Sequence, residues 1–443
     1  MSLTIKRGII LFLAAILTFP ALAASNPNVA GVPVDFVLFG LTLLGVALFH
    51  NYTLYVGLTG LATITLYKLI FAGFKTDAGF AGLVMHLGHE WVVLANLFCL
   101  LMGFGLLSRH FEKSHVAGVL PKYLPNDWKG GFVLLVMVFV LSSFLDNIAA
   151  ALIGGAMAHQ LFKAKVHVGY ITGIVAASNA GGSGSVVGDT TTTMMWIDGV
   201  SPLTVLHAYV ASGVALVITA YVAAKQQHAY SPIIKHTHRH THVDWPRVGI
   251  VGVILVAAIV TNVVINLKFG KLADQFPFMG VAVWLAILAS LPLRRPDWEV
   301  LPETFKGTVF LLSLVTCASM MPVEKLPPAS ALAALGLGFI SAVFDNIPLT
   351  ALALRQGGYD WGFVAYAVGF GGSMIWFGSS AGVAASNMYP EARSVGKWLR
   401  HGWHVTLAYV VGFAVLNFTL GWYPDAPHKN LVALPAPSIV TPP

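Results

Sequence analysis

Two pairs of adjacent Asp and Asn residues lie inside long apolar runs. Asp146 and Asn147 interrupt the stretch LSSFLDNIAAALIGGAMA, and Asp345 and Asn346 interrupt ISAVFDNIPLTALAL further along the chain. An Asp in the middle of a membrane helix costs about 2.5–3.5 kcal/mol on insertion scales, so its presence suggests a function. A carboxylate beside an amide can bind either a proton or a cation. The two pairs therefore predict ion chemistry inside a membrane.

Two further apolar stretches are interrupted by small and oxygen-bearing residues. One reads AASNAGGSGSVVGDTTTTMMW over 176–196, and the other reads GFGGSMIWFGSSAGVAASNM over 369–388. Clustered glycines let a helix unwind and expose its carbonyl groups, while Ser, Thr and Asn add oxygens without charge. Such oxygens suit a hard cation such as Na⁺, whereas opposed helix N-termini would favour an anion, so the motif alone leaves both open.

The composition places these residues in a membrane protein. Of the 443 residues, 57% are hydrophobic and only 10% are charged, with a mean hydropathy of +0.77. Soluble domains carry about 25% charged residues. The net charge of +7 is scattered over short loops, so no nucleic-acid partner is predicted. Cys99 and Cys317 lie in distant apolar segments, which makes a disulfide improbable. We expect an all-α polytopic protein surrounded by lipid.

The N-terminus has the features of a secretory leader. Lys6 and Arg7 precede an apolar run over 8–19 that is too short to cross ~30 Å of hydrocarbon. The sequence Ala-Leu-Ala at 21–23 offers a cleavage site. We predict a signal peptide over 1–24, with an uncleaved anchor helix as the alternative.

Hydropathy predicts twelve apolar segments, over 33–49, 53–73, 91–108, 130–162, 167–197, 203–224, 248–267, 277–293, 307–321, 329–354, 361–388 and 403–422. We interpret 130–162 and 329–354 as re-entrant hairpins, and 167–197 and 361–388 as broken helices that cross the membrane. Sixteen of the 25 Lys and Arg residues then fall on one set of loops and six on the other. The positive-inside rule assigns the richer set to the cytoplasm.

This assignment gives the two hairpins opposite orientations. The first lies between Lys129 and Lys163 on the cytoplasmic side, and the second between Lys325 and Arg355 on the outer side. Two inverted repeats, each with a hairpin and a broken helix, are typical of secondary transporters. The predicted parts are N-terminal scaffold helices over 25–90, a first inverted repeat over 91–224, a His-rich loop and linking helices over 225–306, a second inverted repeat over 307–422, and a Pro-rich tail over 423–443.

The motifs SSFLDNIAAAL, SNAGGSGSVVGDTTTTMMWI, FDNIPLTAL and GFGGSMIWFGSSAGVAASNM resemble those of NhaD-type Na⁺/H⁺ antiporters of the ion transporter superfamily. The resemblance extends from about residue 33 to 422. The superfamily also includes arsenite permeases and citrate or dicarboxylate carriers. The resemblance implies an elevator-type transporter, homodimeric, in a bacterial-type inner membrane, that exchanges Na⁺ or Li⁺ for H⁺. Its partners would be small inorganic ions and membrane lipid.

The resemblance also implies roles for individual residues. Proton and cation carriers fall on Asp146, Asp189 and Asp345, the last of which is a symmetric partner or a structural counterpart. Glu90, in LGHEWVV, matches a family glutamate and is a possible accessory residue. The implied cation ligands are Asn147, Asn179, Thr191, Thr192, Ser341, Asn346, Ser379 and Ser380.

Two features depart from the family pattern. Between the glycines and Gly188-Asp189 the chain has small residues over 183–187, where the family commonly has larger or proline-containing ones. The His-rich loop KHTHRHTH, over 235–242, is a further departure. We interpret it as a solvated basic linker, with divalent-metal binding or pH sensing by His236, His238, His240 and His242 as alternatives.

The expected mechanism is competition between Na⁺ and H⁺ for a shared carboxylate. Desolvation favours the protonated form, and a bound cation favours the charged form. A citrate, dicarboxylate or arsenite carrier is the main alternative, although an anion site should offer Lys or Arg, and the interrupted segments contain none. A channel or sensor is supported only by the His-rich loop. No nucleophile–base pair or metal-ligand spacing is visible in the spans, so we expect neither an enzyme nor a cofactor beyond the transported Na⁺ and H⁺.

Overall fold

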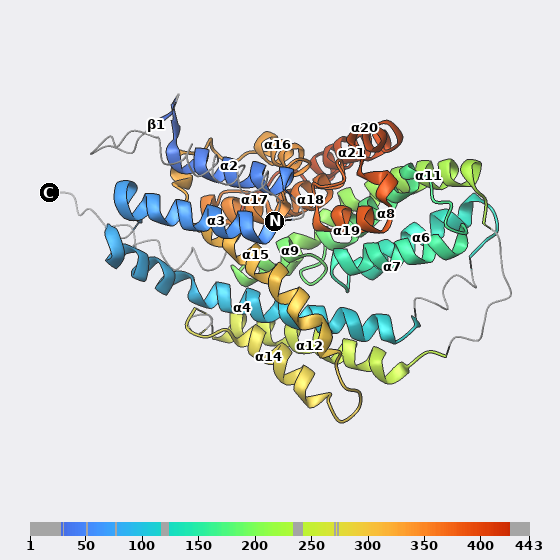
Figure 1. Ribbon diagram of the computed structural model, residues 1–443, viewed down its shortest axis with the longest axis horizontal. Coiled ribbons are helices and arrows are strands. Elements are labelled where there is room, and N and C mark those ends of the chain that lie inside the picture. Colours follow the sequence, from blue (N-terminus) through green and yellow to red (C-terminus); the bar gives the residue numbers. More distant parts are fainter. Residues whose placement is uncertain are drawn as a thin grey trace, which may run out of the picture.

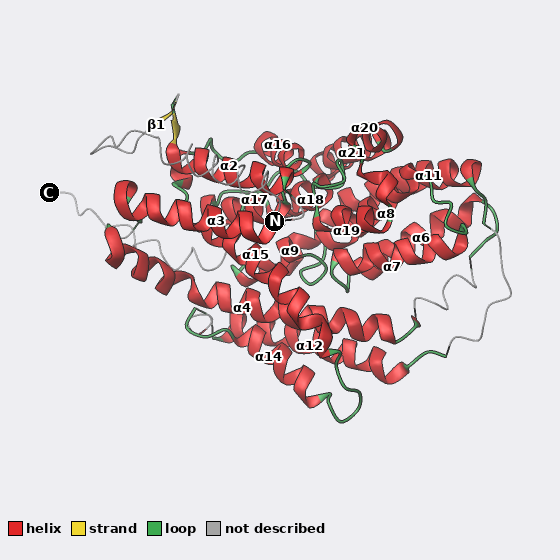
Figure 2. Cartoon of the chain, in the orientation of Figure 1, coloured by secondary structure: helices red, strands yellow, loops and turns green. Residues whose placement is uncertain are grey.

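The computed structural model describes residues 28–425 apart from 30, 50–51, 76–77, 117–123, 234–241, 270–271 and 273. This part of the chain is almost entirely helical (Figure 2), with one short antiparallel pair of strands, β1 (Asn28–Val29) and β2 (Val32–Pro33). The predicted signal peptide and most of the Pro-rich tail lie outside the described residues. So does the His-rich loop except for His242.

The helices form two groups that are interleaved in sequence. The first group consists of α2 (Val34–Leu48), α3 (Thr53–Tyr67) with its extension η2 (Lys68–Ala72), α4 (Gly79–Lys113), α12 (Trp245–Lys268), α14 (Phe278–Ala289), η4 (Trp298–Val300) and α15 (Leu301–Ser319). The second group has two runs. The earlier run is α6 (Trp128–Ser142), α7 (Asn147–Leu161), α8 (Val168–Ser183), α9 (Thr190–Ile197), α10 (Pro202–Leu206) and α11 (Ala208–Tyr230). The later run is η5 (Val323–Lys325), α16 (Ala331–Ser341), α17 (Asn346–Gln356), α18 (Trp361–Gly371), α19 (Ser380–Met388), η6 (Pro390–Arg393), α20 (Val395–His401) and α21 (Trp403–Thr419).

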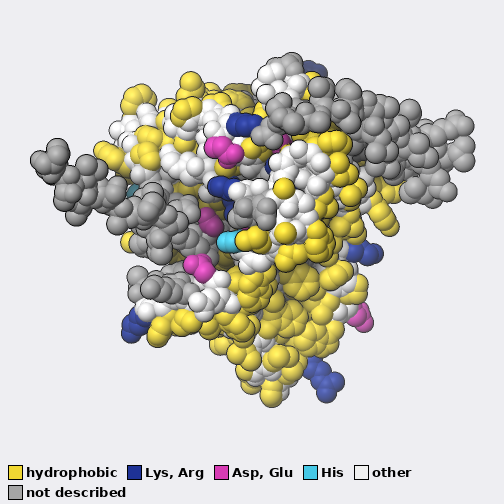
Figure 3. Space-filling model, turned by 90° about the vertical axis from the view of Figure 1, so that its left-hand side faces the viewer, with side chains coloured by type: hydrophobic (Ala, Val, Ile, Leu, Met, Phe, Trp, Pro, Cys, Tyr) yellow, Lys and Arg dark blue, Asp and Glu magenta, His cyan; other side chains and the backbone are white. Residues whose placement is uncertain are grey.

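The outer surface of the helices is strongly apolar. Val253, Val256 and Val260 on α12 are each more than half exposed, and Phe418 on α21 is 87% exposed. Hydrophobic side chains also dominate the lower part of the face in Figure 3. Among the described residues, five helices are long and apolar enough to cross a membrane, or six if the bent pair α20–α21 forms one span. The chain is therefore an all-α polytopic membrane protein, as the composition predicts.

Each of the four long apolar segments breaks where the polar residues interrupt it. The helices end at Ser142, Ser183, Ser341 and Gly371, and new helices begin after gaps of four to eight residues. Glycine permits the close backbone approaches at these breaks: a Cβ on Gly188 or on Gly378 would collide with a backbone carbonyl of the preceding break.

The core of the second group is formed by α8 and α18. Every residue over 169–183 and over 361–371 is buried. Helix α8 packs against α6, α7 and α11, whereas α18 packs against α16 and α21. In Figure 1 the long helix α4 lies between α12 and α14 on one side and α6 and α7 on the other. The groups meet where α15 packs against α17 and α4 packs against α9.

Helix α4 begins earlier than the sequence suggests. The predicted apolar segment starts at residue 91, with Glu90 ahead of it, whereas the helix starts at Gly79 and contains Glu90. The prediction of this boundary is wrong because His86 and Glu90 interrupt the apolar pattern without ending the helix. Both side chains are buried and have partners on other helices: His86 contacts the Ser319 hydroxyl, and Glu90 forms an ion pair.

Candidate functional site

Four helices start at the breaks, and each start is capped by a side-chain oxygen that accepts a backbone N–H. The caps are Asp146 for α7, Asp189 for α9, Asp345 for α17 and Ser379 for α19. The backbone angles match in pairs, with φ −53° and ψ 141° at Asp146 against −53° and 139° at Asp345, and −146° and 145° at Asp189 against −143° and 153° at Ser379. Because helix N-termini carry unpaired N–H groups and partial positive charge, they stabilise carboxylates. The caps thus form two pairs with matching backbone conformation, and together they place three carboxylates and one hydroxyl at helix N-termini.

The carboxylate of Asp189 is the most extensively hydrogen-bonded of the three. Its Oδ1 accepts from the backbone N of Thr191 at 2.8 Å and from the Thr191 hydroxyl at 3.0 Å. Its Oδ2 accepts from Nδ2 of Asn147 at 2.8 Å, and the same Nδ2 donates to Oδ1 of Asn179 at 3.1 Å. Asp189 is only 3% exposed. Three predicted site residues thus gather around the Asp189 carboxylate: Thr191 and Asn147 directly, and Asn179 through Asn147.

Asn179 connects this cluster to the second interruption. Its Nδ2 donates to Oγ of Ser373 at 2.9 Å and to Oγ of Ser379 at 3.0 Å. The predicted ligands include Ser379 but omit Ser373. A repeated signal could have found it, since Gly-Gly-Ser occurs at 181–183 and again at 371–373.

Two of the predicted ligands bond to backbone carbonyls. The Thr192 hydroxyl donates to the carbonyl of Ser185 at 2.6 Å and to that of Asp189 at 2.9 Å, which fixes the loop before α9. The Ser341 hydroxyl donates to the carbonyl of Val368 at 2.8 Å and ties α16 to α18. Both hydroxyls therefore stabilise the backbone around the site.

The second Asp-Asn pair is less connected than the first. Asp345 accepts from the backbone N of Ile347 at 3.0 Å, and the Ser380 hydroxyl lies 3.4 Å from its Oδ2. Asn346 is 3% exposed, and its Nδ2 has no hydrogen-bond partner among the described residues, in contrast to the doubly bonded Nδ2 of Asn147. The polar network is therefore centred on the first half.

Glu90 lies outside this network. Its buried carboxylate pairs with Arg355 at the C-terminal end of α17, and Asp345 caps the other end of that helix. At 1.5 Å per residue the two ends are about 15 Å apart. Glu90 thus ties α4 to α17 without contacting the capped helix starts.

A cavity of about 620 Å³ reaches the site between the two helix groups. One wall is formed by α4 and α15, and the other by α7, α9 and the loop before α9. Asp146 and Asp189 line it together with residues of α4 from Leu100 to Glu112, a rise of about 18 Å. Among the described lining residues one is basic, Arg109, and six are acidic: Glu112, Asp146, Asp189, Asp297, Glu299 and Glu303.

The charged residues at the exposed end of the cavity are not among the predicted site residues; Arg109 and Lys113 were counted only as loop charges. Asp297 accepts from Lys113 at 2.6 Å and from Arg109 at 2.9 Å, and these hydrogen bonds lower the pKa of Asp297 to about 2. It therefore stays ionised at neutral pH. We call Arg109, Glu112, Asp297, Glu299 and Glu303 the mouth of the cavity.

No protein-family model matches the chain. It is 29% identical over 305 residues to "Sodium/proton antiporter 1" of Arabidopsis thaliana, which covers 59% of this chain and 50% of that protein. It is 25% identical over 329 residues to "Sodium/proton antiporter 2" of the same plant, covering 66% of this chain and 74% of that protein. It is 26% identical over 312 residues to "Na(+)/H(+) antiporter NhaD" of Vibrio parahaemolyticus, covering 58% of this chain and 72% of that protein.

The alignment with the first of these relatives spans half of that protein's length. All three relatives are named as antiporters, which are transporters and not enzymes. The resemblance of this chain to NhaD-type Na⁺/H⁺ antiporters is thus confirmed by relatives that carry these names.

Proposed function

We propose that the protein is a secondary active transporter that exchanges Na⁺ or Li⁺ for H⁺ across a bacterial-type inner membrane. The observation that carries this proposal is the cavity, which ends at Asp146 and Asp189 and has six carboxylates against one guanidinium in its described lining. Such a lining attracts small cations and repels multivalent anions. The names of the three relatives support the same exchange.

In this proposal Asp146 and Asp189 are the groups that carry either ion. Asn147 uses its amide nitrogen to hold Asp189 and Asn179, which leaves its carbonyl oxygen as the amide atom suited to a cation. The Thr191 hydroxyl adds a neutral oxygen beside Asp189. Protonation removes the charge that binds Na⁺, so the two ions compete for the same carboxylates. A carrier that moves with either ion, but poorly when empty, exchanges one for the other.

The alternative, a citrate, dicarboxylate or arsenite carrier, has less support. Convergent helix N-termini would suit an anion, but the four at this site are already capped by the chain's own oxygens, three of them carboxylates. Arg109, the basic residue of the described cavity lining, is itself paired with Glu112 and Asp297. An incoming anion would have to displace these carboxylates.

Purified protein in proteoliposomes with an imposed pH gradient tests this function. Addition of Na⁺ or Li⁺ in the absence of organic anions should dissipate the gradient, as measured with a pH-sensitive dye. The response should weaken as the pH falls on the side of cation addition, because protons then occupy the carboxylates that Na⁺ requires. Uptake of citrate or arsenite without any Na⁺-dependent proton movement would reject the antiporter.

We propose further that residues 91–224, with most of α4 and α6–α11, and residues 307–422, with most of α15 and α16–α21, are inverted repeats of an elevator-type, homodimeric transporter embedded in lipid. Their support is the shared order of broken helices and the matched cap angles of Asp146 with Asp345 and of Asp189 with Ser379. In this arrangement the cavity mouth, with Arg109, faces the cytoplasm.

Single-cysteine labelling tests the inverted arrangement. In a background without Cys99 and Cys317, Lys165→Cys should react with a membrane-impermeant maleimide from the cytoplasmic side, and Lys325→Cys from the outer side. Both positions are exposed, so access depends on the side of the membrane alone. Reaction of both cysteines from the same side would rule out inverted hairpins.

A further inference from the structure

The mouth of the cavity brings together charged residues from the end of α4 and from the adjoining η4 and α15. Arg109 and Glu112 lie on the last turns of α4, while Asp297, Glu299 and Glu303 lie at the start of η4 and α15. All five line the same cavity as Asp146 and Asp189. An ion that enters through this cavity therefore passes them.

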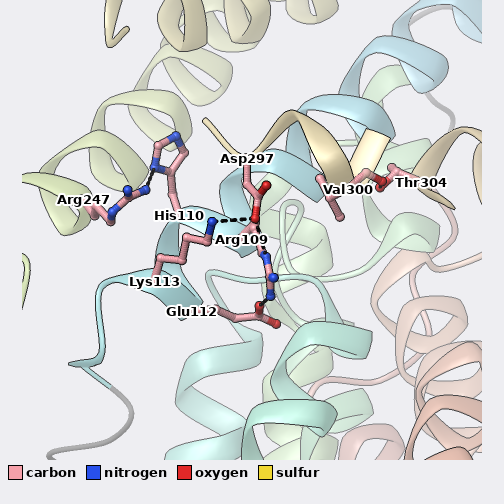
Figure 4. Close-up of polar contacts among 8 residues, drawn as sticks. All are labelled: Arg109, His110, Glu112, Lys113, Arg247, Asp297, Val300 and Thr304. Carbon is pink, nitrogen blue, oxygen red and sulfur yellow. Dashed lines mark hydrogen bonds and ion pairs between the residues drawn. The ribbon is translucent and has the colours of Figure 1, made fainter. Parts of the chain in front are cut away.

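Arg109 bridges two of these carboxylates. Its Nη1 donates to Oε2 of Glu112 at 2.6 Å, and its Nε donates to Oδ2 of Asp297 at 2.9 Å. Lys113 brings a second positive charge to the same Oδ2 at 2.6 Å. Figure 4 shows the three side chains of Arg109, Glu112 and Asp297 in line, with Lys113 reaching Asp297 from the side. The two carboxylates thus converge on one cationic group.

Converging carboxylates are the ordinary ligands of divalent cations. Ca²⁺ and Mg²⁺ bind through carboxylate oxygens, and a divalent ion gains twice the Coulomb energy of a monovalent one at the same site. The mouth holds four carboxylates along the path to the site. Without Arg109 and Lys113, Asp297 and Glu112 would lose the basic partners described above.

We propose that Arg109 and Lys113 are specificity-determining residues, tethered cations that occupy the carboxylates of the mouth and thereby exclude divalent cations while Na⁺ and Li⁺ pass. This inference rests on the proposed exchange function. A fixed guanidinium repels an approaching divalent ion twice as strongly as a monovalent one, so it discriminates by charge. The remaining acidic residues, Glu299 and Glu303, still attract small cations.

The test compares the effect of Ca²⁺ on exchange by wild type and two Arg109 variants in proteoliposomes. Wild type should keep its Na⁺-dependent proton movement when millimolar Ca²⁺ is added on the mouth side. Arg109→Gln should be half-inhibited at about one-tenth of the Ca²⁺ concentration that wild type requires, or less. Arg109→Lys retains the charge and should resemble wild type.

Arg294→Gln is the matched control. Arg294 is 45% exposed and bonds Oδ2 of Asp244 at 2.9 Å, much as Arg109 is 44% exposed and bonds Oδ2 of Asp297 at 2.9 Å, but Arg294 does not line the cavity. This control should show the Ca²⁺ response of wild type. If the loss of any surface ion pair were enough to increase Ca²⁺ inhibition, Arg294→Gln and Arg109→Gln would both show it.

Calorimetry separates a failed inference from a failed function. Ca²⁺ alone should bind purified Arg109→Gln more tightly than wild type, and Arg109→Gln combined with Glu112→Gln should lose that gain. If Arg109→Gln does not fold, Lys113→Gln removes one of the two basic partners of Asp297 and should show a smaller rise in Ca²⁺ affinity. Equal Ca²⁺ binding and equal inhibition in wild type and variants would overturn the inference while leaving Na⁺/H⁺ exchange intact. Absence of exchange in wild type would reject the function, and the calorimetric comparison would still decide the role of the mouth.

Discussion

Asp146→Asn is expected to abolish Na⁺-dependent proton movement in proteoliposomes. The amide preserves the size of the side chain and can still accept the N–H of Ile148 that caps α7, but it can carry neither a proton nor the negative charge that binds Na⁺. In the proposed mechanism Na⁺ pairs with this carboxylate, and removal of one charge from a buried pair costs about 3–5 kcal/mol, so the exchange rate should fall roughly 100-fold or more. The initial rate of dye response after addition of Na⁺ measures it.

Asp127→Asn is the control for this substitution. Asp127 also caps a helix, α6, by accepting the backbone N of Lys129 at 3.0 Å, and it does not line the cavity. The same chemical change there should leave exchange near the wild-type rate. If Asp146→Asn exchanged ions as fast as this control, Asp146 would be a cap and not a carrier.

Asn147→Ala is expected to raise the KM for Na⁺ by about 10- to 100-fold with a smaller change in maximal rate. The substitution removes an amide that holds Oδ2 of Asp189 and Oδ1 of Asn179, and hydrogen bonds to charged groups contribute about 1.5–3 kcal/mol. The carboxylates remain, so the exchange is weakened and not lost. Rates over a range of Na⁺ concentrations at fixed pH give the KM.

Asn417→Ala, at an exposed position of α21, is the control for Asn147→Ala. Its KM should equal that of wild type. Thermal unfolding in detergent should accompany both measurements, because an effect of Asn147→Ala on stability alone would lower the amount of active protein without changing the KM.

Much of the fold could be predicted from the sequence because the membrane imposes strong constraints. Each Asp-Asn pair interrupts a long apolar run, and a helix breaks there so that the Asp caps the next helix. The grouping of Asn147, Asn179, Asp189 and Thr191 was also predictable, since each lies at an interruption and oxygen-rich breaks tend to meet near the middle of the membrane.

Other features depend on contacts between distant segments that leave no local pattern. Glu90 interrupts an apolar run, yet α4 continues through it because Arg355, 265 residues away, neutralises it. Arg109 and Asp297 each look like ordinary charges at a helix end, and only packing of α4 beside η4 makes them walls of one cavity. The repeated Gly-Gly-Ser could have pointed to Ser373, but its contact with Asn179 could not be read from the sequence.

The hydrogen bonds of Asn179 have a mechanical consequence. This side chain is fully buried; it accepts from Asn147 in the first half of the chain and donates to Ser373 and Ser379 in the second. Pulling α8 away from the α18–α19 break would leave several buried polar groups unpaired, each costing about 1–3 kcal/mol. The two broken helices are therefore stiff with respect to each other. In the proposed elevator motion we therefore expect the two broken helices to move together as one rigid body, sliding along the surfaces that face α4 and α15.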